Sequence, residues 1–214
     1  MPGSPTWIAS SDVLSMFPTL VWKFDLASDA QERVTGTVLA ALEKLHRPVS
    51  YGQAAARGWQ SGTGLHTLDE FHELVSYIED AARAVIRFLR IGNAGMEITG
   101  CWANVNPPGA SHGLHSHPNN FLSGVYYVQT PAGADTINFH DPRIQTGIIR
   151  PPVTELTAAN SDQVVVKVNS GTLLLFPAFL QHSVDANESG AERISISFNL
   201  MFSAFTETFS KPLW

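Results

Sequence analysis

Two stretches in the first half of the chain repeat apolar residues at helical spacing. In residues 28–46 the apolar side chains recur every three or four positions, at Val34, Val38, Leu42 and Leu45. Residues 68–90 show the same period, with apolar side chains at Phe71, Leu74, Ile78, Ala81, Val85 and Phe88. Thr67 and Glu70 form the T-x-x-E pattern of a capping box before the second stretch, and Gly92 follows its end. The pattern predicts two helices.

From residue 96 onward the pattern changes to alternating or continuous apolar runs, rich in β-branched and aromatic residues. The runs cover residues 96–106, 122–130, 135–141, 163–177 and 193–202, and Gly and Pro clusters separate them. No helical period interrupts them, so we expect antiparallel sheets arranged as a sandwich, barrel or jelly roll. The sequence therefore predicts an α+β, mainly β fold, with N-terminal helices in residues 1–95 and a sheet core in residues 96–206 of one domain, 1–214.

Composition narrows the choice of partners. The 214 residues carry a net charge of -6, and the 13 Lys and Arg residues form no dense run, which argues against nucleic acid. Cys101 is the only cysteine, which excludes a disulfide within the chain, and we expect it buried in a strand. The N-terminus lacks a signal-peptide pattern, and no apolar run approaches the roughly 20 residues of a membrane span. We therefore expect a cytoplasmic protein without a membrane partner.

Histidines concentrate in residues 111–120, "SHGLHSHPNN". His115 and His117 are two residues apart, so both imidazoles point the same way if the backbone is extended, and both could face one metal ion. His112 lies in the same Gly- and Ser-rich segment, and we expect it at the surface or at the rim of a pocket. His182 follows a later strand, and a hairpin near the chain's end could bring it beside the H-x-H pair.

The last apolar run begins with Arg193, and Ser195 and Ser197 share its face. An arginine beside a hydroxyl forms a fork for a carboxylate. If Arg193 points inward it needs an anionic partner, because an unpaired buried charge is costly. If it only begins the strand at the surface, it points outward. The periodicity leaves both orientations open.

The order H-x-H, a long gap, a third histidine and then R-x-S resembles Fe(II)- and 2-oxoglutarate-dependent oxygenases. More narrowly, five segments resemble a branch of these oxygenases without an assigned substrate: residues 17–26, 102–128, 137–143, 171–184 and 193–199. The resemblance spans about residues 17–199. It implies a double-stranded β-helix (jelly roll or cupin-like) core after N-terminal helices, with Fe(II) and 2-oxoglutarate as cofactors. It also implies hydroxylation of a small-molecule substrate by molecular oxygen, with decarboxylation of 2-oxoglutarate to succinate.

The resemblance assigns roles to individual residues. His115 and His182 match the iron-binding histidines, and Arg193 and Ser195 match the pair that holds the far carboxylate of 2-oxoglutarate. Further residues that match or could reach the cosubstrate are Asn104, Asn199 and either Tyr126 or Tyr127. Only one of these adjacent tyrosines can face inward, and Tyr126 is taken as the candidate.

The chain departs from the family pattern at one position. The usual motif is H-x-D/E…H, two imidazoles and a carboxylate on one face of iron, whereas His117 stands in the carboxylate position here. We predict ligation by three histidines: His115, His117 and His182. In the alternative, His117 turns away, and water or another group such as Asp141 takes the position.

Two other function classes remain open on the sequence. A cupin-like three-histidine metalloenzyme could bind its substrate directly, without 2-oxoglutarate, and Arg193 would then hold the substrate's own carboxylate. A metal- or sugar-binding jelly roll without turnover leaves the Arg193 fork unexplained. A homodimer is the default expectation, because strand edges of jelly rolls often pair.

Overall fold

The structure is a computed structural model that describes residues 7–45, 58–92, 95–143, 149, 151–157 and 159–203. The helices are α1 (Ser28–Leu45) and α2 (His72–Phe88), with two 3-10 turns, η2 (Leu65–Thr67) and η3 (Asp69–Phe71). The strands are β1 (Trp22–Asp25), β2 (Trp59–Gln60), β3 (Met96–Asn106), β4 (His112–His115), β5 (Leu122–Gln129), β6 (Thr136–His140), β7 (Gln163–Lys167), β8 (Thr172–Pro177), β9 (His182–Val184) and β10 (Arg193–Phe202). In this part of the chain, no helix combines the length and apolar character that crossing a membrane requires.

The strands form two antiparallel sheets, as the sequence predicts. The larger sheet has the order β1-β8-β5-β10-β3-β2, and the smaller sheet has the order β4-β9-β6-β7. β10 is central in the larger sheet and pairs with both β3 and β5. The side chains of β10 therefore have only two directions available, toward the helices or toward the smaller sheet.

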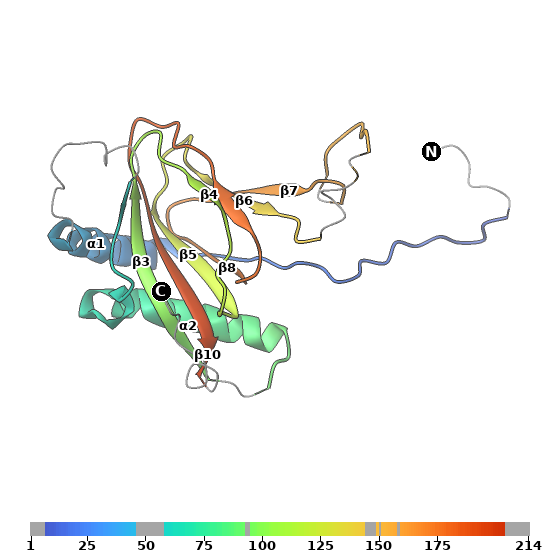
Figure 1. The fold of residues 1–214 in the computed structure, drawn as a ribbon. Helices are drawn as coiled ribbons and strands as arrows, with labels where there is room; N and C mark the ends of the chain where they lie inside the picture. Colours follow the sequence, from blue (N-terminus) through green and yellow to red (C-terminus); the bar gives the residue numbers. More distant parts are fainter. Residues whose placement is uncertain are drawn as a thin grey trace.

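Alternate residues of the larger sheet belong to two separate cores. On one face, Cys101, Tyr126 and Ile196 pack with the buried side chains of α1 and α2. On the opposite face, Tyr127 and Phe176 pack with side chains of the smaller sheet. Figure 1 shows the helices on one side of β3, β5 and β10, and β4, β6 and β7 on the other. The polar residues of β3 and β10 therefore face the space between the sheets.

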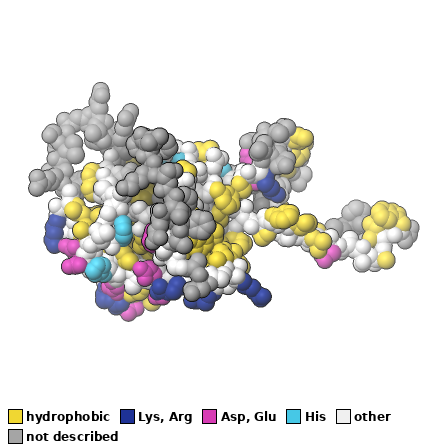
Figure 2. Space-filling view, turned by 60° about the horizontal axis from the view of Figure 1, so that its bottom comes forward, with side chains coloured by type: hydrophobic (Ala, Val, Ile, Leu, Met, Phe, Trp, Pro, Cys, Tyr) yellow, Lys and Arg dark blue, Asp and Glu magenta, His cyan; other side chains and the backbone are white. Residues whose placement is uncertain are grey.

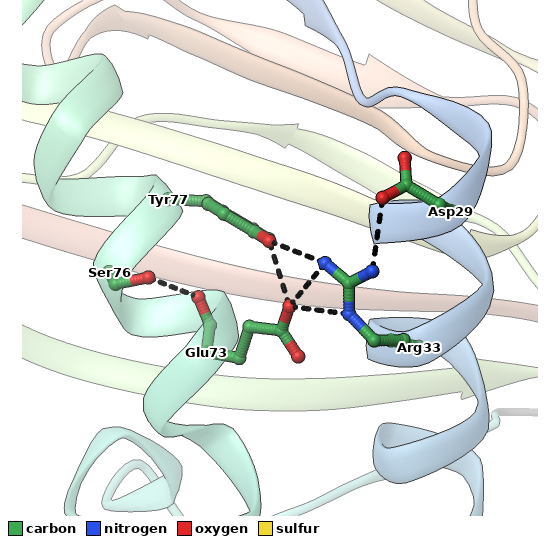
Figure 3. A network of polar contacts seen from close by, with 5 residues as sticks. All are labelled: Asp29, Arg33, Glu73, Ser76 and Tyr77. Atoms are coloured by element: carbon green, nitrogen blue, oxygen red, sulfur yellow. Dashed lines mark hydrogen bonds and ion pairs between the residues drawn. The ribbon is translucent and has the colours of Figure 1, made fainter.

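A polar network joins the two helices. Arg33 of α1 bonds to Asp29 at 3.1 Å and to Glu73 of α2 at 3.1 Å, and the Tyr77 hydroxyl donates to the same carboxylate at 2.8 Å (Figure 3). Ser76 donates its hydroxyl hydrogen to the backbone carbonyl of Glu73. Such exposed ion pairs contribute little stability, about 0–1 kcal/mol each. The network therefore orients the helices, while the buried apolar residues supply most of their attachment.

The structure corrects several local expectations. The capping box is wrong: the Thr67 hydroxyl donates to the Gly64 carbonyl, and α2 begins after a 3-10 turn with no side-chain cap. The first part of the chain, expected to be mainly helical, also contributes β1 and β2 to the larger sheet. Residues 7–20 project from the sheets (Figure 1), and Figure 2 shows hydrophobic side chains along this projecting segment. Trp7 and Phe17 are among its exposed residues.

Candidate metal centre

Two short strands place two of the histidines opposite each other. β4 and β9 pair antiparallel, and His115 is the register partner of His182. His117 lies just beyond β4, where its backbone N–H donates to the Ala178 carbonyl at 2.9 Å. Backbone hydrogen bonds therefore connect β4 with β9, and the residues after β4 with the turn after β8, beside the three histidines.

The three imidazoles converge. The ring centroids of His115 and His182 are 4.3 Å apart, and those of His117 lie 5.1 Å from His115 and 5.2 Å from His182. One nitrogen of each ring lies within 4.8 Å of the others. Imidazole nitrogens are the usual protein ligands of iron, copper, nickel and zinc. The cluster has the composition and the spacing to hold one such ion.

Backbone carbonyls orient two of the rings. The Nδ1 atom of His115 donates to the Gly113 carbonyl at 2.8 Å, and Nδ1 of His182 donates to the Leu180 carbonyl at 3.0 Å. A carbonyl can only accept, so the hydrogen resides on Nδ1 and the lone pair on Nε2. Both histidines therefore present a metal-binding nitrogen to the cluster.

Burial also keeps two of these rings neutral in the metal-free protein. Removal from water lowers the pKa of His117 to about 4, and the charge of His115 adds to the effect. Burial likewise lowers the pKa of His182 to about 4, against the opposing effect of the Leu180 carbonyl. Neutral imidazoles are ready to bind a cation without first losing a proton.

Asp141 is placed away from this cluster. Its carboxylate bonds to the Arg143 side chain at 2.6 Å and accepts the Arg143 backbone N–H at 2.9 Å. It therefore belongs to a turn, and the described residues bring no carboxylate into the histidine cluster. His117, which is half-buried, occupies the third position of the cluster instead.

A cavity of about 480 Å³ lies between the two sheets and contains the cluster. Arg193 and Ser195 of β10 and Asn104 of β3 line it together with the three histidines. Arg193 is only 4% exposed, so its guanidinium points inward. The side-chain amide of Asn104 donates to the Ser197 hydroxyl at 3.0 Å, which positions a second polar group on the same wall.

Among the described residues, no carboxylate forms an ion pair with the Arg193 guanidinium. Its Nε and Nη1 atoms are buried and make no hydrogen bond, and the guanidinium carbon lies 5.2 Å from the Tyr127 ring centroid. The Tyr127 hydroxyl is also buried without a partner, and burial raises its pKa to about 12. Buried polar atoms normally have partners. A cation and a phenol left unpaired in one cavity fit an anionic ligand that brings acceptor oxygens.

Two sequence-based candidates do not line the cavity. Tyr126 faces the helices, where its hydroxyl lies 3.5 Å from that of Thr35, and Tyr127 faces the cavity in its place. Asn199 accepts a hydrogen bond from the Ser123 hydroxyl at 2.7 Å, beyond the cavity wall. The alternation of β10 places Asn199 on the same face as Arg193, Ser195 and Ser197, but the cavity lining on this strand ends at Ser197.

Two polar residues in or beside the site, Asn106 and Asn187, were not assigned a role from the sequence. Asn106, two residues after Asn104, donates its amide to Nε2 of His112 at 2.7 Å, and both side chains line the cavity. Asn187 is buried and donates its amide to the backbone carbonyls of Asn106 and Ala191. It thereby joins the loop before β4 to the loop before β10. Period-two spacing could have found Asn106, whereas nothing local marks Asn187.

Comparison with known proteins gives a family match for residues 100–199. Residues 100–199 match the family model described as "Putative 2OG-Fe(II) oxygenase". This segment belongs to the 2OG-Fe(II) oxygenase family. It contains the histidine cluster, Asn104, Arg193 and Ser195, and the resemblance seen in the sequence is thereby confirmed. No curated protein sequence matches the chain significantly.

Solved structures share the fold. A non-haem alpha-ketoglutarate-dependent carbocyclase, SnoK from nogalamycin biosynthesis, matches with a TM-score of 0.64 at 16% identity, over 92% of this chain and 89% of its own. HygX from Streptomyces hygroscopicus, solved with nickel and 2-oxoglutarate, gives 0.59 at 13% identity, over 86% and 84%. A Pseudomonas putida prolyl-4-hydroxylase gives 0.57 at 14% identity, over 86% and 93%. At such identities the likeness concerns the fold alone.

The residues present fit the cofactors of the 2OG-Fe(II) oxygenase family. Three convergent imidazoles suit Fe(II). The unpaired donors of Arg193, with the neighbouring Tyr127 hydroxyl, suit a carboxylate of 2-oxoglutarate.

Proposed function

We propose that the chain is a non-haem Fe(II)- and 2-oxoglutarate-dependent dioxygenase that hydroxylates a small-molecule substrate. One observation carries the proposal: three histidine nitrogens within 4.8 Å share a cavity with a buried arginine whose Nε and Nη1 have no protein partner. A structural histidine cluster does not need such an arginine, and an arginine with only a structural role would have a carboxylate beside it.

The proposed ligands of Fe(II) are His115, His117 and His182. In this assignment the Gly113 and Leu180 carbonyls hold two of the rings in the tautomer that binds through Nε2. The third ring, His117, comes from a backbone that is tied to Ala178. Orientation by backbone groups reduces the reorganisation that metal binding requires.

Arg193 is the proposed partner of the far carboxylate of 2-oxoglutarate, and Ser195 and Tyr127 are the proposed hydroxyl donors beside it. The Tyr127 phenol remains protonated at neutral pH, because burial raises its pKa to about 12. It can therefore donate a hydrogen bond to the carboxylate without adding a negative charge. Asn104 donates one amide hydrogen to Ser197 and has a second amide hydrogen that can donate to the same ligand.

When bound, Fe(II), 2-oxoglutarate and oxygen together supply an oxidant that can hydroxylate a C–H bond while 2-oxoglutarate is converted to succinate and carbon dioxide. The chain's own residues bind, orient and exclude water. Apolar side chains, among them Val125, Ile137 and Phe176, line the cavity beside the histidines. Trp102, whose ring lies 5.9 Å from that of His117, forms a further wall near the metal position.

Several finer assignments belong to the same proposal. The pairing of β4-β9-β6-β7 opposite the larger sheet supports a double-stranded β-helix core. The single domain over residues 1–214, the cytoplasmic location and the homodimer stay predictions from the sequence.

Separate binding measurements test the proposed roles. Calorimetry should find one Fe(II) site in the anaerobic native protein, no site in His115→Ala or His182→Ala, and an intact site in His140→Ala. His140 is a matched control because its ring bonds to Ser183 and does not belong to the cluster. Stoichiometric iron in His182→Ala would remove that residue from the metal centre. Iron binding without any binding of 2-oxoglutarate would favour the cupin-like enzyme that acts without this cosubstrate.

A further inference from the structure

The residues that line the cavity in the described part of the chain carry no acidic side chain. The sequence has 19 acidic residues, and Glu207 is the only one outside the described ranges. The nearby histidines are neutral or positive, and Arg193 is positive at every pH of interest.

The absence of an acidic side chain from the lining matters once the charges of the proposed cofactors are added. A divalent metal ion and Arg193 bring three positive charges, and the dianion of 2-oxoglutarate cancels two. In the H-x-D/E…H pattern a carboxylate ligand cancels the third. Here His117 stands in that position, so the loaded site retains one positive charge in a cavity whose innermost groups are almost dry. Arg193 is 4% exposed and His182 is 5% exposed.

We infer that the substrate brings the missing negative charge, as a carboxylate or a comparable small anionic group bound beside the metal. The inference rests on the proposed function and names the substrate class for the same site. An opposite charge about 6 Å from the excess charge, at an effective dielectric of about 20, favours an anion on the order of 10- to 100-fold over a neutral isostere. A neutral or cationic substrate gains nothing from this arrangement.

Uncharged donors are available for the anionic group. Gln60 of β2 and His112 of β4 line the cavity and belong to neither of the proposed cofactor-binding sets. Burial and the neighbouring Arg193 lower the pKa of His112, so the ring stays neutral. Since Asn106 donates to Nε2 of His112, the hydrogen lies on Nδ1, which can donate to an anion.

The test compares acetate with acetamide, which differ in charge but hardly in size. The protein is loaded with Ni(II), which does not support turnover, and with saturating 2-oxoglutarate in chloride-free buffer. Calorimetry should show that acetate binds at least about 10-fold more tightly than acetamide, and that 2-oxoglutarate is not displaced. Equal affinities, or no detectable acetate binding, would overturn the inference.

Two variants locate the charge. His117→Asp restores a carboxylate beside the metal and should reduce the preference for acetate by about 10-fold. Ser111→Asp adds the same charge on an exposed residue outside the cavity lining, and its preference should remain that of the native protein. An equal loss of preference in both variants would contradict a charge effect within the cavity. If His117→Asp fails to hold nickel, the acetate and acetamide affinities of the native protein decide the question.

The failure of this inference can be distinguished from the failure of the proposed function. Failure of 2-oxoglutarate to bind the nickel-loaded protein would refute the proposed function. Normal binding of 2-oxoglutarate with no preference for acetate would refute only the anionic substrate.

Discussion

Replacement of Arg193 by Met should have opposite effects on the ligand-free protein and on its complex with 2-oxoglutarate. Met has a similar length and no charge, so it fills the same space between the two sheets. In the ligand-free protein the buried guanidinium lacks partners for Nε and Nη1. The substitution therefore removes a desolvation cost there, and removes the main anion-binding group in the complex.

The magnitudes follow from the contacts. Each unsatisfied buried donor costs about 1–3 kcal/mol, while loss of the cation–π contact with Tyr127 forfeits about 0.5–2 kcal/mol. We therefore expect the free energy of unfolding to stay equal or to rise by about 1–2 kcal/mol. Two charge-assisted hydrogen bonds to a carboxylate contribute about 3–6 kcal/mol together. Affinity for 2-oxoglutarate should fall by about 10²–10⁴-fold.

Urea denaturation of the metal-free protein and calorimetry of the metal-loaded protein measure the two effects. Arg83→Met is the matched control, because Arg83 is an exposed arginine of α2 that pairs with Asp80 at 2.7 Å. It should change stability by less than about 1 kcal/mol and leave 2-oxoglutarate binding unaltered. If Arg193→Met is strongly destabilised and still binds 2-oxoglutarate normally, the guanidinium is a structural group and the proposed role is wrong.

Three further predictions concern Tyr127, Gly124 and Cys101 of the larger sheet. Tyr127→Phe should lower 2-oxoglutarate affinity by about 3- to 10-fold without loss of stability, whereas Tyr126→Phe should leave the affinity unchanged in the same calorimetric assay. Gly124→Ala should destabilise the fold by at least about 2 kcal/mol in urea, because its Cβ would lie 2.6 Å from the Leu174 carbonyl oxygen and overlap a cross-strand ring; native-like stability would disprove the close packing. Burial raises the pKa of Cys101 to about 12, so almost no thiolate forms at pH 8, and a thiol reagent should label it only at the rate of unfolding. Labelling at the rate of a free thiol would show that the strand is accessible.

Elements with a strong local period were predictable from the sequence. The apolar run at residues 96–106 matches β3, and the run at residues 193–202 matches β10. The short strands β4 and β9 were not predictable, because each has at most four residues in a polar context. They exist through their pairing with each other, which is a long-range interaction that local periodicity does not contain.

The residue types of the candidate site and their order along the chain were predictable, but the direction in which each side chain points was only partly predictable. Arg193 could face either way by periodicity, and its direction follows from the helices covering the opposite face of β10. The choice between Tyr126 and Tyr127 failed for the same reason, since β5 is buried on both faces and its pattern does not identify the cavity side. Asn199 shares the cavity face of β10, but the residue types do not show that the cavity lining ends at Ser197.

An anaerobic absorption titration shows whether 2-oxoglutarate chelates an iron ion held by the histidine cluster. Metal-free protein is mixed with Fe(II), then with 2-oxoglutarate, and the visible spectrum is recorded after each addition. We expect a charge-transfer band that appears only when both are present, and that is absent in His182→Ala. Iron binding without a band, and without any competition by a 2-oxoglutarate mimic, would contradict the account, and so would an absence of iron binding by the native protein.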